Sequence, residues 1–289
     1  MCPVAVVTDS TSYLPPALIE RERIGVVPLY VVFGGDRIVP EVEITDYPAF
    51  FEELRGAEKL PTTSQPSVGD FTATFEPLLA AGNEIVSVHI SGGLSGTPEA
   101  ARQAKDALSR DGKGGELIEV VDSTTAAGGL GFMVLAAAKG ARDGGNAKDV
   151  AEHVAQARKE LRLWFGIDTL EFLKRGGRIG AASAWIGSTL QVKPILTVEN
   201  EMTPVERVRT SSRMFERLVE YARGCAESGA DAWSAQHINA PDLCDELIER
   251  CTEIYGHGPT IVSEIGPVLS AHTGPGLLGT GALPSRFVN

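Results

Sequence analysis

Small hydroxyl residues gather in four short segments of the chain, and their positions suggest a site for an anion. Two segments, Thr63–Ser67 (TSQPS) and Ser91–Thr97 (SGGLSGT), lie beside apolar or helical stretches. Two others, Val6–Ser12 and Val120–Ala126, place Asp-Ser-Thr directly after a strand-like run. Hydroxyl and backbone N–H groups at strand ends and helix starts bind anionic head groups. The segments bring no evident base, metal-ligand set or nucleophile with them, so we predict a protein that holds an anion.

The segment around Ser95 is close to a hydrolase motif but lacks its last residue. A nucleophile elbow has the pattern Gly-x-Ser-x-Gly, whereas Ser95 is followed by Gly96 and then Thr97. The sequence predicts instead that Thr97 caps a helix whose first residue is Pro98. The amides near Ser95 and Gly96 would then point out of a helix N-terminus, which carries a partial positive charge. A glycine-rich turn that only caps the helix is the alternative, and the sequence leaves both open.

The TSQPS segment has two interpretations of the same kind. Pro66 and Ser67 suit a turn ahead of a helix expected at Val68–Ala81, and the hydroxyl groups would then only form that turn. A binding role for Thr63 is favoured by the other Ser/Thr turns, several of which follow predicted parallel strands. The carboxyl ends of such strands share one edge of the sheet, where ligands bind.

Two aspartates and two histidines are further candidates for acid–base chemistry. Asp9 and Asp122 follow strands and are typical helix caps or turn formers. A paired-carboxylate catalyst stays open, because the sequence does not set the distance between these two side chains. His272 stands in AHTGPG, whose glycines and proline predict an exposed loop, whereas His89 ends a strand and is expected to be partly buried.

A basic stretch, Lys174–Arg178 (KRGGR), interrupts an otherwise acidic chain. Its glycines predict a turn, which either is simply solvated or docks a phosphate-bearing partner or ligand. The sequence contains neither a GxxxxGK[ST] phosphate loop nor a GxGxxG motif after its first strand. We therefore expect no nucleotide cofactor.

The composition argues against nucleic acid and membrane as main partners. The 38 acidic residues outnumber the 26 basic ones, and the net charge of −12 disfavours binding to a phosphate backbone. The most apolar stretch, Ala126–Ala138, is too short for a bilayer, and the first residues lack the pattern of a signal peptide. The cysteines form no CxxC pair and no zinc spacing with a histidine, which predicts a cytoplasmic protein without a metal site; they are Cys2, Cys225, Cys244 and Cys251. Cys2 is not expected to carry a lipid.

Strand and helix signals alternate through the first half of the chain and change in the second. The alternation predicts right-handed crossovers and a mainly parallel sheet flanked by helices, in a domain of residues 1–160. Beyond it, strand-like runs at Val192–Val198 and Val205–Thr210 are divided by Asn200-Glu201, which predicts a hairpin. The sequence therefore predicts a two-domain α/β protein whose second domain, residues 161–289, carries a mixed or antiparallel sheet. A chain of 289 residues also exceeds the usual size of a single core.

The remaining expected elements follow from the same patterns. Further strands are expected at Val4–Thr8, Val26–Phe33, Ile85–His89, Leu117–Val121, Trp164–Asp168 and Thr260–Glu264. Further helices are expected at Tyr13–Glu22, Asp46–Arg55, Thr97–Leu108, Ala126–Arg142, Lys148–Leu161, Arg213–Ala226 and Asp242–Ile254. The glycines of Gly34–Asp36 predict a turn, and the Asp46–Arg55 helix is expected to be capped near Thr45.

Taken in order along the chain, seven such segments resemble the DegV family, the fatty-acid-binding group. Each segment alone is a weak signal, but their order covers almost the whole length. They are Val6–Pro15, Thr62–Ser67, Ile90–Thr97, Val120–Thr124, Leu170–Gly180, Val192–Leu196 and Gly266–Gly279.

The resemblance implies two α/β domains that hold a fatty acid between them, with the acyl chain in an apolar tunnel. It implies that the carboxylate meets Thr63 and Ser95. Related proteins act as the acyl-carrying subunit of a bacterial fatty acid kinase, in which a separate ATP-binding protein phosphorylates the bound acid. The resemblance thus implies a binding subunit without catalysis of its own. Further contacts to the head group or the partner are expected at Ser64, Gly96, Arg178, Arg209 and His272.

Two positions depart from the family pattern, and two other functions stay open. Gly92 stands where a second serine is common, and Pro98 where an aromatic residue often follows Gly-Thr, which leaves the acyl-chain preference open. One alternative function is a self-sufficient serine esterase or acyl-phosphate hydrolase that uses Ser95 with His272 as its base. The other is a lipid sensor without transfer chemistry.

Overall fold

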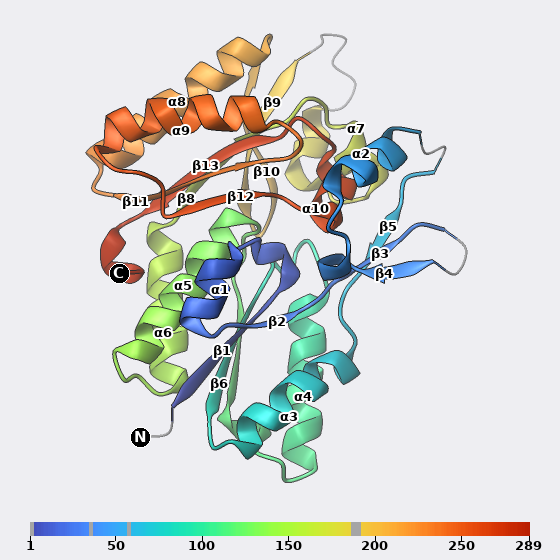
Figure 1. Cartoon of the computed structure of the whole chain (residues 1–289), viewed down its shortest axis with the longest axis vertical. Coiled ribbons are helices and arrows are strands. Elements are labelled where there is room, and N and C mark those ends of the chain that lie inside the picture. The colour runs from blue at the N-terminus through green and yellow to red at the C-terminus, as the bar shows by residue number, and fades with distance from the viewer. Residues whose placement is uncertain (1–2, 35–36, 57–58, 186–191) are drawn as a thin grey trace.

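The computed structural model describes residues 3–34, 37–56, 59–185 and 192–289. Within these residues the strands assemble into sheets of four, six and three strands, named sheets A, C and B here. Figure 1 shows sheet A in the lower half of the molecule, sheet C in the upper half and sheet B at one side. Cys2 and part of the predicted Gly34–Asp36 turn lie outside the described residues.

Sheet A confirms the predicted parallel sheet of the first half. Its order is β2-β1-β6-β7, and each neighbouring pair is parallel. Successive side chains of a strand point to opposite faces. Val7 and Ile85 accordingly pack with α3 and α4, whereas Val6 and Val86 join the core formed with α5 and α6. The strands are β1 Val4–Asp9, β2 Gly25–Val27, β6 Glu84–His89 and β7 Ile118–Asp122. The helices are α1 Pro16–Glu22, α3 Val68–Ala80, α4 Thr97–Arg110, α5 Gly128–Arg142 and α6 Ala147–Glu160.

Sheet C confirms the predicted mixed sheet of the second half. Its order is β10-β9-β8-β13-β11-β12, with β11 and β12 parallel and the other pairs antiparallel. Its strands are β8 Arg162–Gly166, β9 Lys193–Glu199, β10 Glu201–Val208, β11 Ala232–His237, β12 Ile261–Glu264 and β13 Leu278–Leu283. The helices α8 Ser211–Glu227 and α9 Pro241–Tyr255 pack on one face of this sheet.

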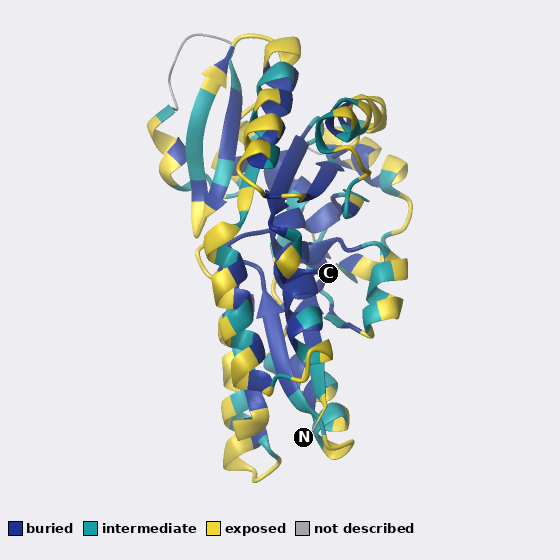
Figure 2. Ribbon diagram, turned by 90° about the vertical axis from the view of Figure 1, so that its left-hand side faces the viewer, coloured by how far each residue is buried: buried dark blue, intermediate teal, exposed yellow. Residues whose placement is uncertain are grey.

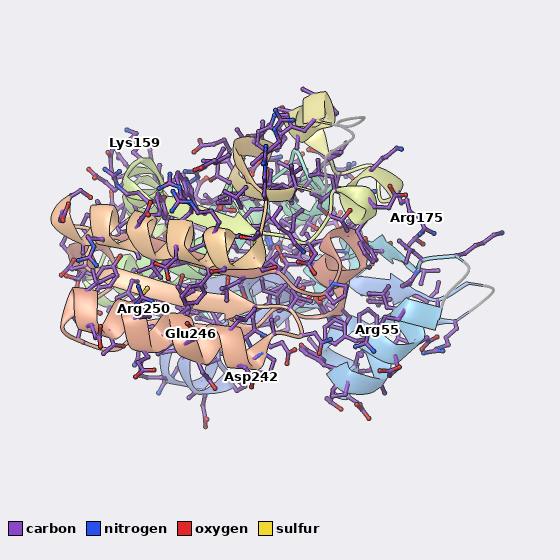
Figure 3. All side chains as sticks on the ribbon, turned by 90° about the horizontal axis from the view of Figure 1, so that it is seen from above. Arg55, Lys159, Arg175, Asp242, Glu246 and Arg250 are labelled. Carbon is purple, nitrogen blue, oxygen red and sulfur yellow. The ribbon has the colours of Figure 1, made fainter. Side chains whose placement is uncertain are left out.

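The two helices over sheet C lie side by side with their charged faces outward. Figure 3 looks onto this layer and labels Asp242, Glu246 and Arg250 along the outer side of α9. Residues four apart share one helix face, so these three form a solvated stripe. Arg250 also forms an ion pair with Glu216 of α8, at 3.3 Å. The opposite face of sheet C is not covered by these helices and faces the start of α5.

Sheet B is a small antiparallel sheet that stands beside the junction of the two larger sheets. Its order is β4-β3-β5, from β3 Tyr30–Val32, β4 Ile38–Pro40 and β5 Thr62–Ser64. Three further helices are α2 Tyr47–Gly56, α7 Glu171–Arg175 and α10 Pro267–Thr273. Helix α10 follows β12 and precedes β13 of sheet C, and it contacts α2, α7 and the strands β3 and β5 of sheet B (Figure 1). The 3-10 turns are η1 Ser10–Ser12, η2 Glu41–Glu43, η3 Gly115–Leu117, η4 Gly180–Trp185 and η5 Ser285–Phe287.

The predicted hairpin is confirmed, but the strand expected at Val26–Phe33 is wrong. Strands β9 and β10 pair antiparallel around Asn200, whose φ of 70° lies in the left-handed region that Asn tolerates. The Val26–Phe33 segment is divided between β2 of sheet A and β3 of sheet B. Pro28 has no N–H to give to a ladder, and the next amide, of Leu29, donates to the Ser10 hydroxyl at 3.1 Å. The chain therefore leaves one sheet and enters the other at this point.

Two other local features differ from the expectations. The first helix does not begin at Tyr13, because Tyr13 ends η1 with a φ of 45° and α1 starts at Pro16. The cap expected near Thr45 is confirmed at the next residue, Asp46, whose carboxylate accepts a hydrogen bond from Ala49 N at 2.9 Å. Strands β11 and β13 were not predicted. Glycines give β13 little strand propensity, and its pairing with β8 and β11 supplies what the local sequence lacks.

One apolar core joins sheets A and C. It contains Val6 and Val86 from sheet A together with Phe165 and Leu196 from sheet C. Figure 2 shows buried residues running through the inner strands of both halves, with exposed residues on the outer helices. Helix α6 ends at Glu160 and sheet C begins at β8, so the change of sheet falls beside the expected boundary. A division into domains there stays a prediction. No helix in the described part of the chain has the length and apolarity to cross a bilayer.

Candidate functional site

Two hollows meet beside α10 and differ in the chemistry of their walls. The first, named the head chamber here, is lined by polar groups that include Thr63, Ser64, Ser95, Gly96, Arg178 and His272. The second, named the tail chamber, is lined mainly by apolar side chains, among them Leu163, Phe165, Val198, Ile265 and Leu277. Met202, Leu269 and Thr273 belong to the walls of both. The two hollows therefore share a wall at which they meet.

Thr63 and His272 form the central polar contact of the head chamber. The Thr63 hydroxyl and His272 Nε2 are 2.8 Å apart, although 209 positions separate the two residues. Thr63 lies in β5, the edge strand of sheet B, and not in the turn expected from the sequence. His272 lies in the last turn of α10 and is 9% exposed, so the expectation of an exposed loop is wrong. The helix ends at Thr273, and Gly274 follows it as the cap residue.

The imidazole of His272 is held in its neutral form. Burial, reinforced by the Arg178 guanidinium, lowers the pKa of His272 to about 4. Its second ring nitrogen, Nδ1, is buried and has no hydrogen-bond partner among the described residues. Gly176 approaches this nitrogen so closely that an added Cβ would lie 2.3 Å from it. The glycine is therefore required where the end of α7 meets α10.

Ser95 lies just before α4, in a loop that is stabilised by hydrogen bonds within its own backbone. The Ser95 amide donates to Ser91 O at 3.0 Å, so it does not point out of the helix as expected. The Ser95 hydroxyl contacts Thr97 Oγ1 at 2.8 Å and accepts from Thr97 N at 3.3 Å. The helix cap is Gly96 and not Thr97, because Thr97 is already the first helical residue. The Gly96 amide has no partner among the described residues and lies in the wall of the head chamber.

Gly96 also marks a close approach between two loops. An added Cβ would lie 2.1 Å from Gln65 Oε1, so only glycine lets the TSQPS segment and the α4 start come together. Gln65 lines the same chamber and was not singled out from the sequence. Ser64 and Gln65 are exposed, and they form the outer side of the chamber.

The basic stretch contributes one residue to the chamber. Lys174 and Arg175 end α7, and Figure 3 shows Arg175 directed away from the body of the protein. Arg178 lines the head chamber and is fixed by donating to Leu94 O at 3.3 Å and to Gly176 O at 2.8 Å. Arg209 is not among the lining residues; it follows β10 and is exposed.

The tail chamber lies on the face of sheet C that α8 and α9 leave free. Trp164 and Trp233 point toward those helices, and the neighbouring Phe165 and Ser234 point into the chamber, as the period of two requires. Its polar residues are engaged elsewhere. Gln236 accepts from Gly128 N and donates to Ser263 Oγ, and Ser234 donates weakly to Gly281 O at 3.4 Å. The chamber thus presents an almost wholly apolar wall.

The two aspartates considered for catalysis hold loops together. Asp9 accepts hydrogen bonds from Thr11 N at 3.0 Å and Ile90 N at 2.9 Å. Asp122 accepts from Gly92 N at 3.1 Å and from Thr124 N at 2.9 Å. These contacts are those of turn formers.

His89 belongs to a serine–histidine–aspartate chain inside sheet A. Its Nε2 is 2.6 Å from Ser87 Oγ and its Nδ1 is 3.0 Å from Asp9 Oδ2. All three residues are fully buried, so His89 is more buried than expected and the serine is closed to any substrate. The other hydrolytic pair, Ser95 with His272, forms no hydrogen bond, since Ser95 is bonded to Thr97 and His272 to Thr63. The described residues also contain no cluster of three or more His, Cys, Asp or Glu side chains able to hold a metal ion.

Leu269 and Thr273 are site residues that the sequence reasoning missed. They lie four apart on α10, with His272 beside them, and so share one helix face. The available signal was Gly266-Pro267, since proline is frequent in the first turn of a helix. A helix starting there places Leu269, His272 and Thr273 together.

Comparison with known proteins gives consistent matches over the whole chain. A family model described as "Uncharacterised protein, DegV family" matches residues 3–285. A DegV domain-containing protein of Streptomyces coelicolor is 40% identical over 279 residues, which cover 96% of this chain and 96% of that protein. The solved structure named for fatty acid binding of a DegV family protein from Thermus thermophilus matches with a TM-score of 0.85 at 35% identity, covering 98% of this chain and 99% of that one. The structure of DegV, a fatty acid binding protein from Bacillus subtilis, matches with a TM-score of 0.87 at 32% identity, covering 98% and 100%.

The burial of His272 predicts an unusual titration. In the protein freed of ligand, the ring should stay neutral until the pH approaches about 4, as followed by NMR of the ring nitrogens. The unfolded chain takes up this proton near pH 6.5, so between these values the unfolded state binds more protons. Stability should therefore fall with decreasing pH across this window, by roughly 1 kcal/mol per pH unit from this group. Arg178→Gln should raise the midpoint; a wild-type midpoint near 6.5 would contradict the buried, neutral ring.

Proposed function

Because this chain belongs to the DegV family, and because its polar and apolar chambers meet, we propose that it binds a long-chain fatty acid. The carboxylate lies in the head chamber at Thr63 and Ser95, and the acyl chain occupies the tail chamber. The observation that carries this proposal is the shared wall of Met202, Leu269 and Thr273, at which a hydroxyl-lined hollow adjoins an almost wholly apolar one. A ligand that fills both has one polar end and one long apolar part.

His272 selects which way the Thr63 hydroxyl can donate. A neutral imidazole carries its proton on one nitrogen only. If Nε2 is protonated, it donates to the Thr63 oxygen, and the Thr63 hydroxyl hydrogen is free for the carboxylate. If Nδ1 is protonated, Thr63 must donate to Nε2 and turns only lone pairs to the ligand, which repels an anion. A bound carboxylate therefore requires the Nε2–H form, and Thr63 then donates to it.

Ser95 and the start of α4 supply the second side of the head-group site. The Ser95 hydroxyl has Thr97 Oγ1 as neighbour, and a carboxylate lets Ser95 donate outward while it accepts from Thr97. The partnerless Gly96 amide adds a donor at a helix N-terminus, where partial positive charge favours an anion. Hydroxyl and amide donors keep the carboxylate ionised and fix its orientation.

The acyl chain contributes most of the binding free energy. Burial of each methylene from water contributes about 0.8 kcal/mol, so a sixteen-carbon chain contributes roughly 10 kcal/mol before ordering costs. The hydrogen bonds of the head chamber contribute less binding free energy than this. We therefore assign affinity to the tail chamber and orientation to Thr63 and Ser95.

The bound acid is presented to a separate ATP-dependent kinase subunit. The outer side of the head chamber is formed by exposed Ser64 and Gln65, so a partner can reach the carboxylate there. The partner transfers the γ-phosphoryl group of ATP to a carboxylate oxygen, which yields the acyl phosphate and ADP. Arg178 at the chamber wall is placed to meet the added phosphate charge, and exposed Arg209 is a candidate contact for the partner. The free thiols of the described cysteines fit the cytoplasmic location proposed for this reaction.

Thr63 and Ser95 should contribute to binding of the carboxylate and not to binding of the acyl chain. Replacing either with Ala removes a charge-assisted hydrogen bond, so palmitate should bind roughly tenfold to a hundredfold more weakly. Hexadecanol, which has no ionised head, should lose little in the Thr63→Ala/Ser95→Ala double variant. Titration calorimetry of both ligands with wild type and variants measures the difference. Equal losses for acid and alcohol would show that the two residues only shape the chamber.

A kinase partner should be detectable by its product. The purified chain with palmitate, ATP and extract of a bacterium that encodes a DegV-family protein should give acyl phosphate, trapped with hydroxylamine as the hydroxamate. The chain without extract should give none, because its sequence contains no GxxxxGK[ST] phosphate loop. Product from the chain alone would make it an enzyme in its own right. No increase over extract alone would leave a binding protein or sensor without transfer chemistry.

A further inference from the structure

A buried carboxylate stands behind α10, outside the walls of both chambers. Glu41 begins η2, is 3% exposed and accepts hydrogen bonds from three donors. Its Oε1 accepts from Tyr13 OH at 2.6 Å and from Val268 N at 2.7 Å, and its Oε2 accepts from Ser10 Oγ at 2.5 Å. Glu41 thus joins η1 and η2, near the N-terminus of the chain, to the first turn of α10, near the C-terminus of the chain.

Tyr13 completes this contact by accepting as well as donating. Its hydroxyl accepts from Leu269 N at 3.3 Å while it donates to Glu41. The first amides of a helix have no partner inside the helix, and the residue that precedes α10, Gly266, has no side chain to cap them. Glu41 and Tyr13 therefore cap α10 from outside, and this arrangement is named the α10 clasp here.

The residues of the α10 clasp pack so closely around Gly266 that the start of α10 has little room to move. An added Cβ on Gly266 would lie 2.7 Å from the Tyr13 ring, 2.7 Å from Tyr47 OH and 3.1 Å from Glu41 Oε1. Tyr13 itself has a φ of 45°, a conformation that costs a non-glycine residue energy and persists only where the surroundings impose it. Burial raises the pKa of Glu41 to about 7, and the hydrogen bonds from Ser10, Tyr13 and Val268 oppose that rise. The contacts that hold α10 thus also favour the ionised form of the carboxylate against the effect of burial.

The position of α10 matters because one short helix serves both chambers. It has seven residues, so its two ends are less than two turns apart and move together. Leu269 and Thr273 line both chambers, and His272 reaches Thr63. A shift of the first turn is therefore carried to the shared wall and to the hydrogen bond that orients the Thr63 hydroxyl.

We propose that Glu41 and Tyr13 are positioning residues for fatty acid binding: by capping α10 from behind, they set where Leu269, His272 and Thr273 stand in the two chambers. This inference rests on the proposed function for its ligand. Neither residue lines the head or the tail chamber, so both act through α10 and not by contact with the acid.

Tyr13→Phe tests the α10 clasp with a single lost oxygen, and Tyr47→Phe is its matched control. Both tyrosines approach Gly266, but the Tyr47 hydroxyl makes no hydrogen bond with a residue that the structure describes. In the full-length protein freed of ligand, Tyr13→Phe should shift the ring-nitrogen NMR signals of His272. It should also weaken palmitate binding by about threefold to tenfold, the size expected for one or two lost hydrogen bonds. Tyr47→Phe should change neither.

The outcomes separate this inference from the proposed function. If wild type binds palmitate and Tyr13→Phe matches it in affinity and His272 signals, the positioning role is wrong and the proposed function stands. If wild type takes up no palmitate, the proposed function fails, and the His272 signals of ligand-free Tyr13→Phe alone decide whether the α10 clasp positions the helix. Glu41→Gln, which keeps the side-chain volume, is judged by the same two measurements if Tyr13→Phe does not fold.

Discussion

The hydrogen bond between Thr63 and His272 is the contact on which the rest of the site depends. It joins an edge strand of sheet B to α10 at 2.8 Å, and neither element belongs to the large sheets. The contact needs the His272 ring to lie beside Thr63. Glycine at 176 lets the end of α7 approach the other side of that ring, and Glu41 and Tyr13 cap α10 from behind. In the proposed function, the Thr63 hydroxyl group donates to the carboxylate of the ligand.

Sheet C provides the apolar part of the site. Because side chains alternate along a strand, sheet C can pack α8 and α9 on one face and line a hollow with the other. Gly279 lines that hollow without a side chain to fill it, and the amide of Gln236 is satisfied by Gly128 and Ser263. Because the polar groups in the wall of this chamber already have hydrogen-bond partners, the chamber does not need bound water to satisfy them and suits an apolar ligand.

The sequence predicted the parts of the fold that local pattern determines. Alternating strands and helices gave the parallel sheet, and Asn200 marked the hairpin of the mixed sheet. His272 was placed in a loop because α10 is short and capped by Glu41 and Tyr13, residues more than two hundred positions away that no local pattern connects to it. Thr63 and Ser95 came from the family resemblance, whereas hydroxyl-rich turns alone left a structural role equally open. Arg209 came from the same resemblance, and the structure does not bring it to the chambers.

The central claim is that one molecule spans both chambers, with an ionised head and a long apolar tail. Extraction of the purified protein with organic solvent, followed by mass spectrometry, identifies such a molecule directly. The account predicts a long-chain fatty acid in the extract, or near-stoichiometric uptake when palmitate or oleate is added to the delipidated protein. Recovery of no acid, together with no uptake of either acid, would contradict it.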